Sequence, residues 1–144
     1  RGEGTSNEYL PPEVPSLPAF SMLRAISSAV RDQGKDYWTG TIYTTNRRVW
    51  EYDTAFKDYL KRTHATGIDM ETATLLTAGF ANKIPTGALL MISDKPMEED
   101  GVKTEASDRI VTRSFAPEHV KLGIEALHQI IDEKKTVRHI RFSW

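Results

Sequence analysis

The sequence predicts an α/β fold built on a parallel sheet, from three observations along residues 67–94. A short strand pattern ends at Gly67-Ile68, and a helical pattern follows over residues 71–82. Pro85 ends that helix, and residues 88–92 (Ala-Leu-Leu-Met-Ile) form a continuous apolar run. Such a run is typical of a strand buried on both faces. Strand, helix and strand in this order predict a βαβ unit with a right-handed crossover.

The composition is that of an ordinary globular domain. Hydrophobic residues make up 39% of the 144 residues and charged residues 27%, with a formal net charge of −1. A dedicated nucleic-acid-binding domain is normally basic, so we expect no nucleic-acid partner. No apolar run approaches the roughly 18 residues that a membrane span needs. Cysteine is absent, which suits a reducing cytoplasm. Because the chain opens on Arg1 and not on methionine, we expect it to be a fragment or a processed product.

Upstream of the βαβ unit, the pattern predicts an irregular segment and three elements. Two glycines and four prolines make residues 2–18 an irregular segment. Ser16 is the expected cap of the first helix, and Gly34 its stop. Phe20, Leu23, Ile26 and Val30 share one face of that helix, and Phe56 and Leu60 share a face of the second. The predicted elements are a helix over residues 16–33, a strand over 38–45 and a helix over 53–63.

Downstream of the βαβ unit, a polar stretch over residues 96–105 predicts a mobile loop. A helix is expected over residues 117–133, because proline suits the first turn of a helix. Residues 134–144 alternate apolar and polar side chains and predict an edge strand or a docked extension. The apolar stripe of the helix is expected at Val120, Ile124, Leu127 and Ile131.

Two acidic residues follow the two strands of the predicted unit. Glu71 comes just after the first strand and Asp94 just after the second. The carboxyl ends of parallel strands lie on one edge of a sheet, where open α/β folds bind ligands. A purely structural interpretation is also open: Asp69 as a helix cap, Glu71 as a first-turn residue favoured by the helix dipole, and Asp94 as a turn residue. Spacing alone favours this structural interpretation.

Two motifs change that balance. Gly-Ile-Asp-Met-Glu-Thr-Ala-Thr at residues 67–74, followed by Ile-Ser-Asp at residues 92–94, resembles the paired signature of the nucleoside phosphorylase superfamily. The resemblance implies a phosphorylase/hydrolase-like three-layer α/β fold with a central mixed sheet. It also implies that residues 1–144 form only the C-terminal part of one catalytic domain. The glycine loop and the phosphate-binding arginines of the family's N-terminal half are then expected outside this chain.

Within the superfamily, the AMP nucleosidases are the most similar group. Residues 44–51 (Thr-Thr-Asn-Arg-Arg-Val-Trp-Glu) and 93–96 (Ser-Asp-Lys-Pro) resemble stretches of that family. The resemblance implies hydrolysis of AMP to adenine and ribose 5-phosphate, in purine salvage or nucleotide catabolism. It further implies a small-molecule substrate (AMP or a purine nucleoside), no cofactor, no metal, and a cytoplasmic homo-oligomer, often a hexamer built from dimers.

The resemblance assigns roles to the acidic residues. Asp94 would protonate the leaving purine near N7, or, if it stays ionised, accept a hydrogen bond from an already protonated purine. General acid catalysis of this kind typically contributes about 10²–10⁴ in rate. Glu71 would accept hydrogen bonds from both ribose hydroxyls. Met70 offers an adaptable surface to the ribose, although core packing is its ordinary role. Ile68 and Ser93 would lie beside the same pocket.

Residues 47–50 fall where the superfamily lines the base pocket. Many relatives place an aromatic residue at about Arg48; this chain does not, although Trp50 is close. Val49 is expected to line the same pocket. Arg48 has two open interpretations: a bidentate partner of a 5′-phosphate, or a solvated surface arginine. Arg109 resembles an arginine that supports the acid in some phosphorylases, but the intervening loop is longer here.

Two other functions stay open at this stage. A purine nucleoside phosphorylase would use the same pocket with phosphate as the nucleophile, and a non-catalytic module would bind purine nucleotides without turnover. The chain alone is expected to be nearly inactive, because residues that position water or phosphate would lie upstream. Gly2 to Ser6 does not predict a phosphate cradle, since a lone Gly-x-Gly without a preceding strand is a weak motif.

Overall fold

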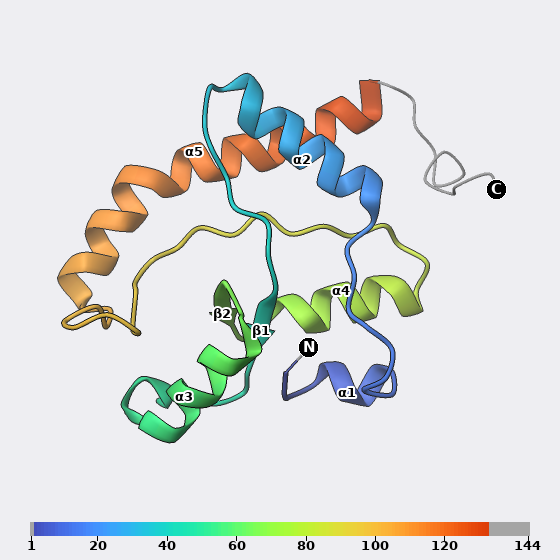
Figure 1. Ribbon diagram of the computed structural model, residues 1–144. Helices are drawn as coiled ribbons and strands as arrows, with labels where there is room; N and C mark the ends of the chain where they lie inside the picture. Colours follow the sequence, from blue (N-terminus) through green and yellow to red (C-terminus); the bar gives the residue numbers. More distant parts are fainter. Residues whose placement is uncertain (1, 133–144) are drawn as a thin grey trace.

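The computed structural model describes residues 2–132, and Arg1 and residues 133–144 are outside this description. Helices surround a small parallel sheet (Figure 1). The edge strand or docked extension predicted for residues 134–144 therefore lies outside the described residues. The elements in chain order are α1 (Ser6–Tyr9), α2 (Phe20–Asp32), β1 (Ile42–Thr44), the 3₁₀ turn η1 (Trp50–Tyr52), α3 (Thr54–Thr63), β2 (Gly67–Asp69), α4 (Thr72–Ala81) and α5 (Glu105–Asp132).

The parallel pair of the sheet is formed by β1 and β2. Ile42 lies opposite Gly67 and Thr44 opposite Asp69. The connection between the strands is α3, so β1, α3 and β2 form a βαβ unit. Asp53 caps α3 by accepting a hydrogen bond from the Phe56 backbone N–H at 2.9 Å, as expected of an aspartate at this position. The predicted helix over residues 53–63 is thus confirmed, and so is the strand at Gly67.

Aromatic side chains fill the space between β1 and α3. Tyr43, Trp50, Phe56 and Leu60 are buried together, with Ile68 packed against them. The Phe56 ring meets Tyr43 edge-on at 5.8 Å between ring centroids and Trp50 edge-on at 6.2 Å. Such edge-to-face pairs stabilise beyond the apolar area that they bury. This cluster packs α3 and η1 against β1.

A second core lies between α2 and α5, which cross each other at the top of Figure 1. Small side chains let the two helices approach: Ala25 and Ala29 of α2 pack against Ala126 of α5. Polar contacts border this core, and one joins Lys35 Nζ to the Glu118 carboxylate at 3.0 Å. The predicted stop of α2 at Gly34 is confirmed, since this glycine has a φ of +66°, which favours glycine.

The predicted strand over residues 88–92 is wrong. This stretch runs as an extended segment without a hydrogen-bonded strand partner among residues 2–132. The parallel pairing predicted for it is instead made by β1 and β2. A strand needs the backbone of a neighbour, and an apolar run carries no information about which neighbour is present. The run is also incompletely buried, because Leu90 is 43% exposed and Ile92 61% exposed.

The long helix α5 differs from its prediction in both length and orientation. It begins at Glu105 and contains Pro117 in its interior, whereas the sequence predicted a start at Pro117. The side that packs on α2 includes the buried Leu122 and Ala126. The four residues expected to face the core are instead exposed. That exposed stripe consists of Val120, Ile124, Leu127 and Ile131.

The first helix and the first strand are shorter than predicted. Ser16 does not cap α2, which begins at Phe20; its hydroxyl instead contacts the hydroxyl of Thr77 at 2.7 Å. Phe20 is 60% exposed, so it does not belong to the buried face of α2. Of the strand predicted over residues 38–45, only β1 forms, and Trp38 is 95% exposed. Among the described residues, the structure contains no helix both long enough and apolar enough to cross a membrane.

Candidate functional site

The candidate site begins where β1 and β2 end side by side. Thr44 and Asp69 are opposite each other in the parallel register. The Thr44 hydroxyl donates a hydrogen bond to the Asp69 carboxylate at 2.7 Å and accepts one from the Ala73 N–H at 3.0 Å. The second Asp69 oxygen accepts a hydrogen bond from the Thr72 N–H at 2.7 Å. The first two backbone N–H groups of α4 are thereby satisfied, one by Asp69 and one by Thr44, but the N-cap residue is Glu71 and not Asp69 as predicted.

Met70 and Glu71 occupy the turn between β2 and α4. Both side chains are exposed, with Met70 at 41%. A Glu71 carboxylate oxygen accepts a hydrogen bond from the Met70 N–H at 3.2 Å. This single bond to an exposed partner is long, so a ligand hydroxyl can replace it at little cost. Glu71 is therefore an available acceptor at the sheet edge, as the resemblance implies, while Ile68 packs into the aromatic core below.

The segment after β1 is held by the N-terminal residues. The Glu3 carboxylate accepts hydrogen bonds from the Thr45 hydroxyl at 2.8 Å and from Arg47 Nε at 3.1 Å. Arg47 also pairs with Asp53 at 3.5 Å and stacks over the Phe56 ring, with 4.3 Å between the guanidinium carbon and the ring centroid. The Arg47 side chain is thus committed to structural contacts.

The three residues selected from this loop have different environments. The Arg48 side chain is exposed and forms no hydrogen bond or ion pair with other residues of the described part of the chain. Val49 is also exposed, at 68%. Trp50 is buried at 8% exposure, and its ring packs against Phe56. Its ring is engaged in the core and not presented to solvent, so a contact of Trp50 with a base stays a prediction.

Tyr43 lies in the core beside Phe56 and carries a perturbed acid–base group. Burial raises the pKa of the Tyr43 hydroxyl to about 12, with further contributions from the neighbouring Tyr59 and Glu3. Removal from water disfavours the phenolate, and the negative charge of Glu3 adds to that effect. Tyr43 is therefore a neutral, structural residue over the physiological pH range.

Ser93 and Asp94 lie at the end of the extended segment. The Ser93 hydroxyl donates a hydrogen bond to the Asp94 carboxylate at 2.6 Å, and both residues are half-buried. The segment passes close to β2, because a Cβ on Gly67 would lie 4.0 Å from Cδ1 of Ile92. Asp94 follows Ile92 by two residues. The segment that carries Asp94 therefore passes close to β2, the strand that leads into Glu71.

Arg109 has a local partner. It lies in the first part of α5 and forms an ion pair with Glu105 one turn earlier. Both side chains are exposed. Asp94 in turn is bonded to Ser93. A role for Arg109 in supporting the acid stays a prediction.

Sequence reasoning missed the polar residues that organise the site. Thr44 and Thr45 are 2% and 1% exposed, but within a β-branched run they are typical strand residues. Glu3 belongs to the segment interpreted as irregular, although its N–H donates to the Thr44 carbonyl at 3.0 Å. The only available signal was the resemblance of residues 44–51 to a family stretch, and that signal pointed to Arg48.

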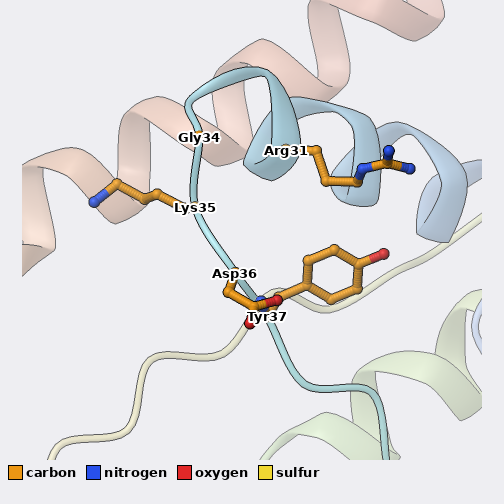
Figure 2. A pocket seen from close by; sticks show the side chains of 5 residues that line it. All are labelled: Arg31, Gly34, Lys35, Asp36 and Tyr37. Carbon is orange, nitrogen blue, oxygen red and sulfur yellow. The ribbon is translucent and has the colours of Figure 1, made fainter.

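The structure also contains an open pocket of about 600 Å³ at the end of α2. Figure 2 shows its lining, in which the Tyr37 ring and the Arg31 side chain extend beside the chain that leaves α2. The Tyr37 hydroxyl lies 2.6 Å from the Ser27 hydroxyl. None of the residues predicted for the site lines this pocket. Its lining residues are Arg31, Gly34, Lys35, Asp36 and Tyr37.

Comparisons with known proteins bear on this arrangement. A crystal structure of AMP nucleosidase from Bacteroides thetaiotaomicron is similar to this chain, with 67% identity and a TM-score of 0.77 over 94% of the chain and 53% of that protein. AMP nucleosidase from Escherichia coli K12 is 30% identical over 138 residues, which cover 88% of this chain and 28% of the relative. Uridine phosphorylase from Treponema pallidum is 26% identical over 102 residues, or 64% of this chain and 40% of the relative.

The chain thus spans about half the length of the solved relative and less of the two others. The family described as the phosphorylase superfamily matches residues 1–133, nearly the whole chain. The match includes both motifs on which the resemblance was based and the N-terminal segment that binds Thr45 and Arg47. The α/β chain with its parallel β1–β2 pair therefore belongs to the phosphorylase superfamily.

Proposed function

We propose that this chain supplies the ribose- and purine-binding part of an enzyme that hydrolyses AMP to adenine and ribose 5-phosphate. The observation that carries the proposal is the 67% identity to an AMP nucleosidase across 94% of the chain. The family match over residues 1–133 contains the turn with Met70 and Glu71 and the Ser93–Asp94 pair. The process served would be purine salvage or nucleotide catabolism.

The chemistry assigns one task to each acidic residue. Water adds to C1′ of the ribose while the bond from C1′ to the purine nitrogen breaks, and the proton that the water loses replaces the one that Asp94 gives to the purine. Asp94 gives its proton to the leaving purine, near N7, so that adenine departs neutral. The Ser93 hydroxyl, 2.6 Å from that carboxylate, orients it. The Glu71 carboxylate accepts hydrogen bonds from the ribose hydroxyls, and its negative charge favours the oxocarbenium-like sugar of the transition state.

The remaining predicted residues complete the pocket. Met70 and Val49 provide exposed apolar surface near the sheet edge, and Arg48 is assigned to the 5′-phosphate. We further propose that residues 1–144 are the C-terminal part of one catalytic domain, with a larger mixed sheet completed by polypeptide outside them. The support is the shared length, 53% of the solved relative. A homo-oligomer and a cytoplasmic location stay predictions.

A second candidate is a phosphorylase, in which phosphate replaces water at C1′. The similarity to a uridine phosphorylase, at 26% identity over 64% of the chain, supports the phosphorylase as the second candidate. Both reactions would use Glu71 and Asp94 in the same way. A module that binds AMP without cleaving it is the alternative from a different class.

One experiment separates the three functions. Adenine release from AMP is measured with the full-length natural protein, with and without inorganic phosphate, beside an Asp94→Asn variant. Hydrolysis predicts release without phosphate and a loss of about 10²–10⁴ in kcat in the variant. Strict dependence on phosphate would assign a phosphorylase. Binding of AMP without release under either condition would leave the non-catalytic module.

The 144-residue chain alone serves as the matched control. If part of the site lies outside residues 1–144, the isolated chain should release adenine at a rate near the background. An isolated chain as active as the full-length protein would contradict the assignment of the chain to one part of a divided site.

A further inference from the structure

Two acidic residues lie within three positions at the end of β2, and their surroundings differ sharply. Both oxygens of the Asp69 carboxylate are occupied, one by the Thr44 hydroxyl and one by the Thr72 N–H, each at 2.7 Å. The Glu71 side chain is exposed, and among the described residues its carboxylate is bonded only to the adjacent Met70 N–H, at 3.2 Å. One carboxylate is therefore committed within the protein, while the other is available to a ligand.

Asp69 and Thr44 together fix both ends of the turn that presents Glu71. The Asp69 carbonyl accepts a hydrogen bond from the Thr45 N–H at 2.9 Å, which ties the start of the turn to β1. The bond from Thr72 to the Asp69 carboxylate closes the turn on itself. The bond from the Ala73 N–H to the Thr44 hydroxyl, 3.0 Å long, ties the start of α4 to β1.

Satisfying the first backbone N–H group of α4 would need only the bond from Thr72 to Asp69. The Thr44 hydroxyl adds a link between two strands and a helix, and Thr44 is 2% exposed. In that position its single donor and one acceptor site are both used. The orientation of the Asp69 carboxylate, and with it the turn over Met70 and Glu71, is thereby set by a residue on the neighbouring strand.

We propose that Thr44 and Asp69 are positioning residues that hold the Glu71 carboxylate at the ribose hydroxyls, and that Asp69 itself does not bind the sugar. This inference rests on the proposed function only in assigning the ribose to Glu71. A group that must meet two hydroxyls loses much of its effect when it is displaced by about 1 Å. The link should therefore matter most for substrates that carry both hydroxyls.

The test compares AMP with 2′-deoxyadenosine 5′-monophosphate, which lacks one of those hydroxyls. Thr44→Val keeps the shape of the side chain and removes both hydrogen bonds, whereas Thr44→Ser keeps the hydroxyl. The kcat/KM of each full-length variant is measured for both nucleotides. Thr44→Val should reduce the preference for AMP over the deoxynucleotide roughly tenfold, and Thr44→Ser should restore it.

A second comparison isolates Glu71. In a Glu71→Gln background the preference should already be low, and adding Thr44→Val should change it less than twofold, since residues that act through one another are not additive. Asp69→Asn, which keeps one acceptor oxygen, provides an independent disruption if Thr44→Val does not fold. It should lower the preference for AMP in the same direction.

The outcomes are distinguishable from failure of the proposed function. If the wild-type protein binds AMP without cleaving it, the same preference is measured from the two dissociation constants. An unchanged preference in Thr44→Val and Asp69→Asn, with only a lower melting temperature, would overturn the positioning role. A larger loss of preference in Asp69→Asn than in Glu71→Gln would also overturn it, because Asp69 would then bind the sugar itself.

Discussion

The two adjacent arginines after β1 provide the sharpest test of how the site would recognise a nucleotide. Arg47 is bound by Glu3 at 3.0 Å, by Asp53 at 3.5 Å, and by the Phe56 ring. Arg48 makes none of these contacts and is exposed. Replacing Arg48 with methionine removes the charge and retains much of the length. Arg48→Met should therefore lower the activity toward the substrate and leave the stability of the fold unchanged.

The magnitude follows from the chemistry of the contact. A hydrogen bond to a charged group contributes about 1.5–3 kcal/mol, and each 1.4 kcal/mol corresponds to about a factor of ten. Loss of the contact between Arg48 and the 5′-phosphate should lower kcat/KM for AMP roughly 10- to 150-fold. Adenosine has no phosphate, so its kcat/KM should change by less than about threefold.

The assay is adenine release by the full-length protein from AMP and from adenosine, for the wild type and Arg48→Met. Arg113→Met is the matched control, because Arg113 is an exposed arginine of α5 without an ion pair among the described residues. It should alter neither substrate. An equal loss for AMP and adenosine in Arg48→Met would refute the phosphate assignment, and so would full activity toward AMP.

Two further predictions concern stability. Gly79→Ala should destabilise the protein by about 1–3 kcal/mol, because a Cβ would lie 2.5 Å from a methyl carbon of Thr86. In α5, a Cβ at Gly123 would meet no atom within 4 Å, so Gly123→Ala should stabilise the protein by up to about 1 kcal/mol. The urea concentration at the midpoint of unfolding should fall for Gly79→Ala and rise for Gly123→Ala. Shifts of the same sign would contradict this account of the packing. Tyr43→Phe should change the pH dependence of stability only at alkaline pH. The unfolded chain releases the tyrosine proton near pH 10, whereas the folded protein retains it to about 12. Tyr43 therefore contributes no pH dependence below about 10, and from there to about 12 stability falls with pH by up to about 1.4 kcal/mol per pH unit. The free energy of unfolding in urea is measured at about pH 9 and pH 11, and it should fall less between these pH values in the variant than in the wild type. An equal fall in both proteins would show that Tyr43 is not the group responsible.

The sequence predicted best those elements whose signals are local. The helix over residues 53–63 and the stop at Gly34 depend on a few neighbouring residues, and both are observed. The strand at residues 88–92 failed because strand formation depends on a partner backbone that a hydrophobic run does not identify. The prediction of which side of α5 faces the core was wrong for a similar reason. Apolar residues occupy two sides of this helix, and periodicity cannot tell which side meets α2.

In the candidate site, too, local features could be predicted from the sequence and contacts between distant residues could not. The motif around Met70 and Glu71 could be predicted because it is contiguous in the sequence. The bond from Thr44 to Asp69 joins residues 25 positions apart, and it depends on the parallel register of β1 and β2. Glu3 reaches Arg47 across 44 positions. Contacts of this kind arise from the fold and leave no spacing pattern in a single sequence.

Pro117 interrupts the hydrogen bonding of α5. Proline has no N–H, so the Arg113 carbonyl lacks its usual helical donor, and the two halves of the helix are joined by one fewer bond. In the half after Pro117, Ala126 packs on α2, and Glu118 forms an ion pair with Lys35, which follows α2. The half before Pro117 carries Arg109 and continues from the segment that contains Asp94. The anchored half should therefore exchange its amide protons more slowly than the half before Pro117.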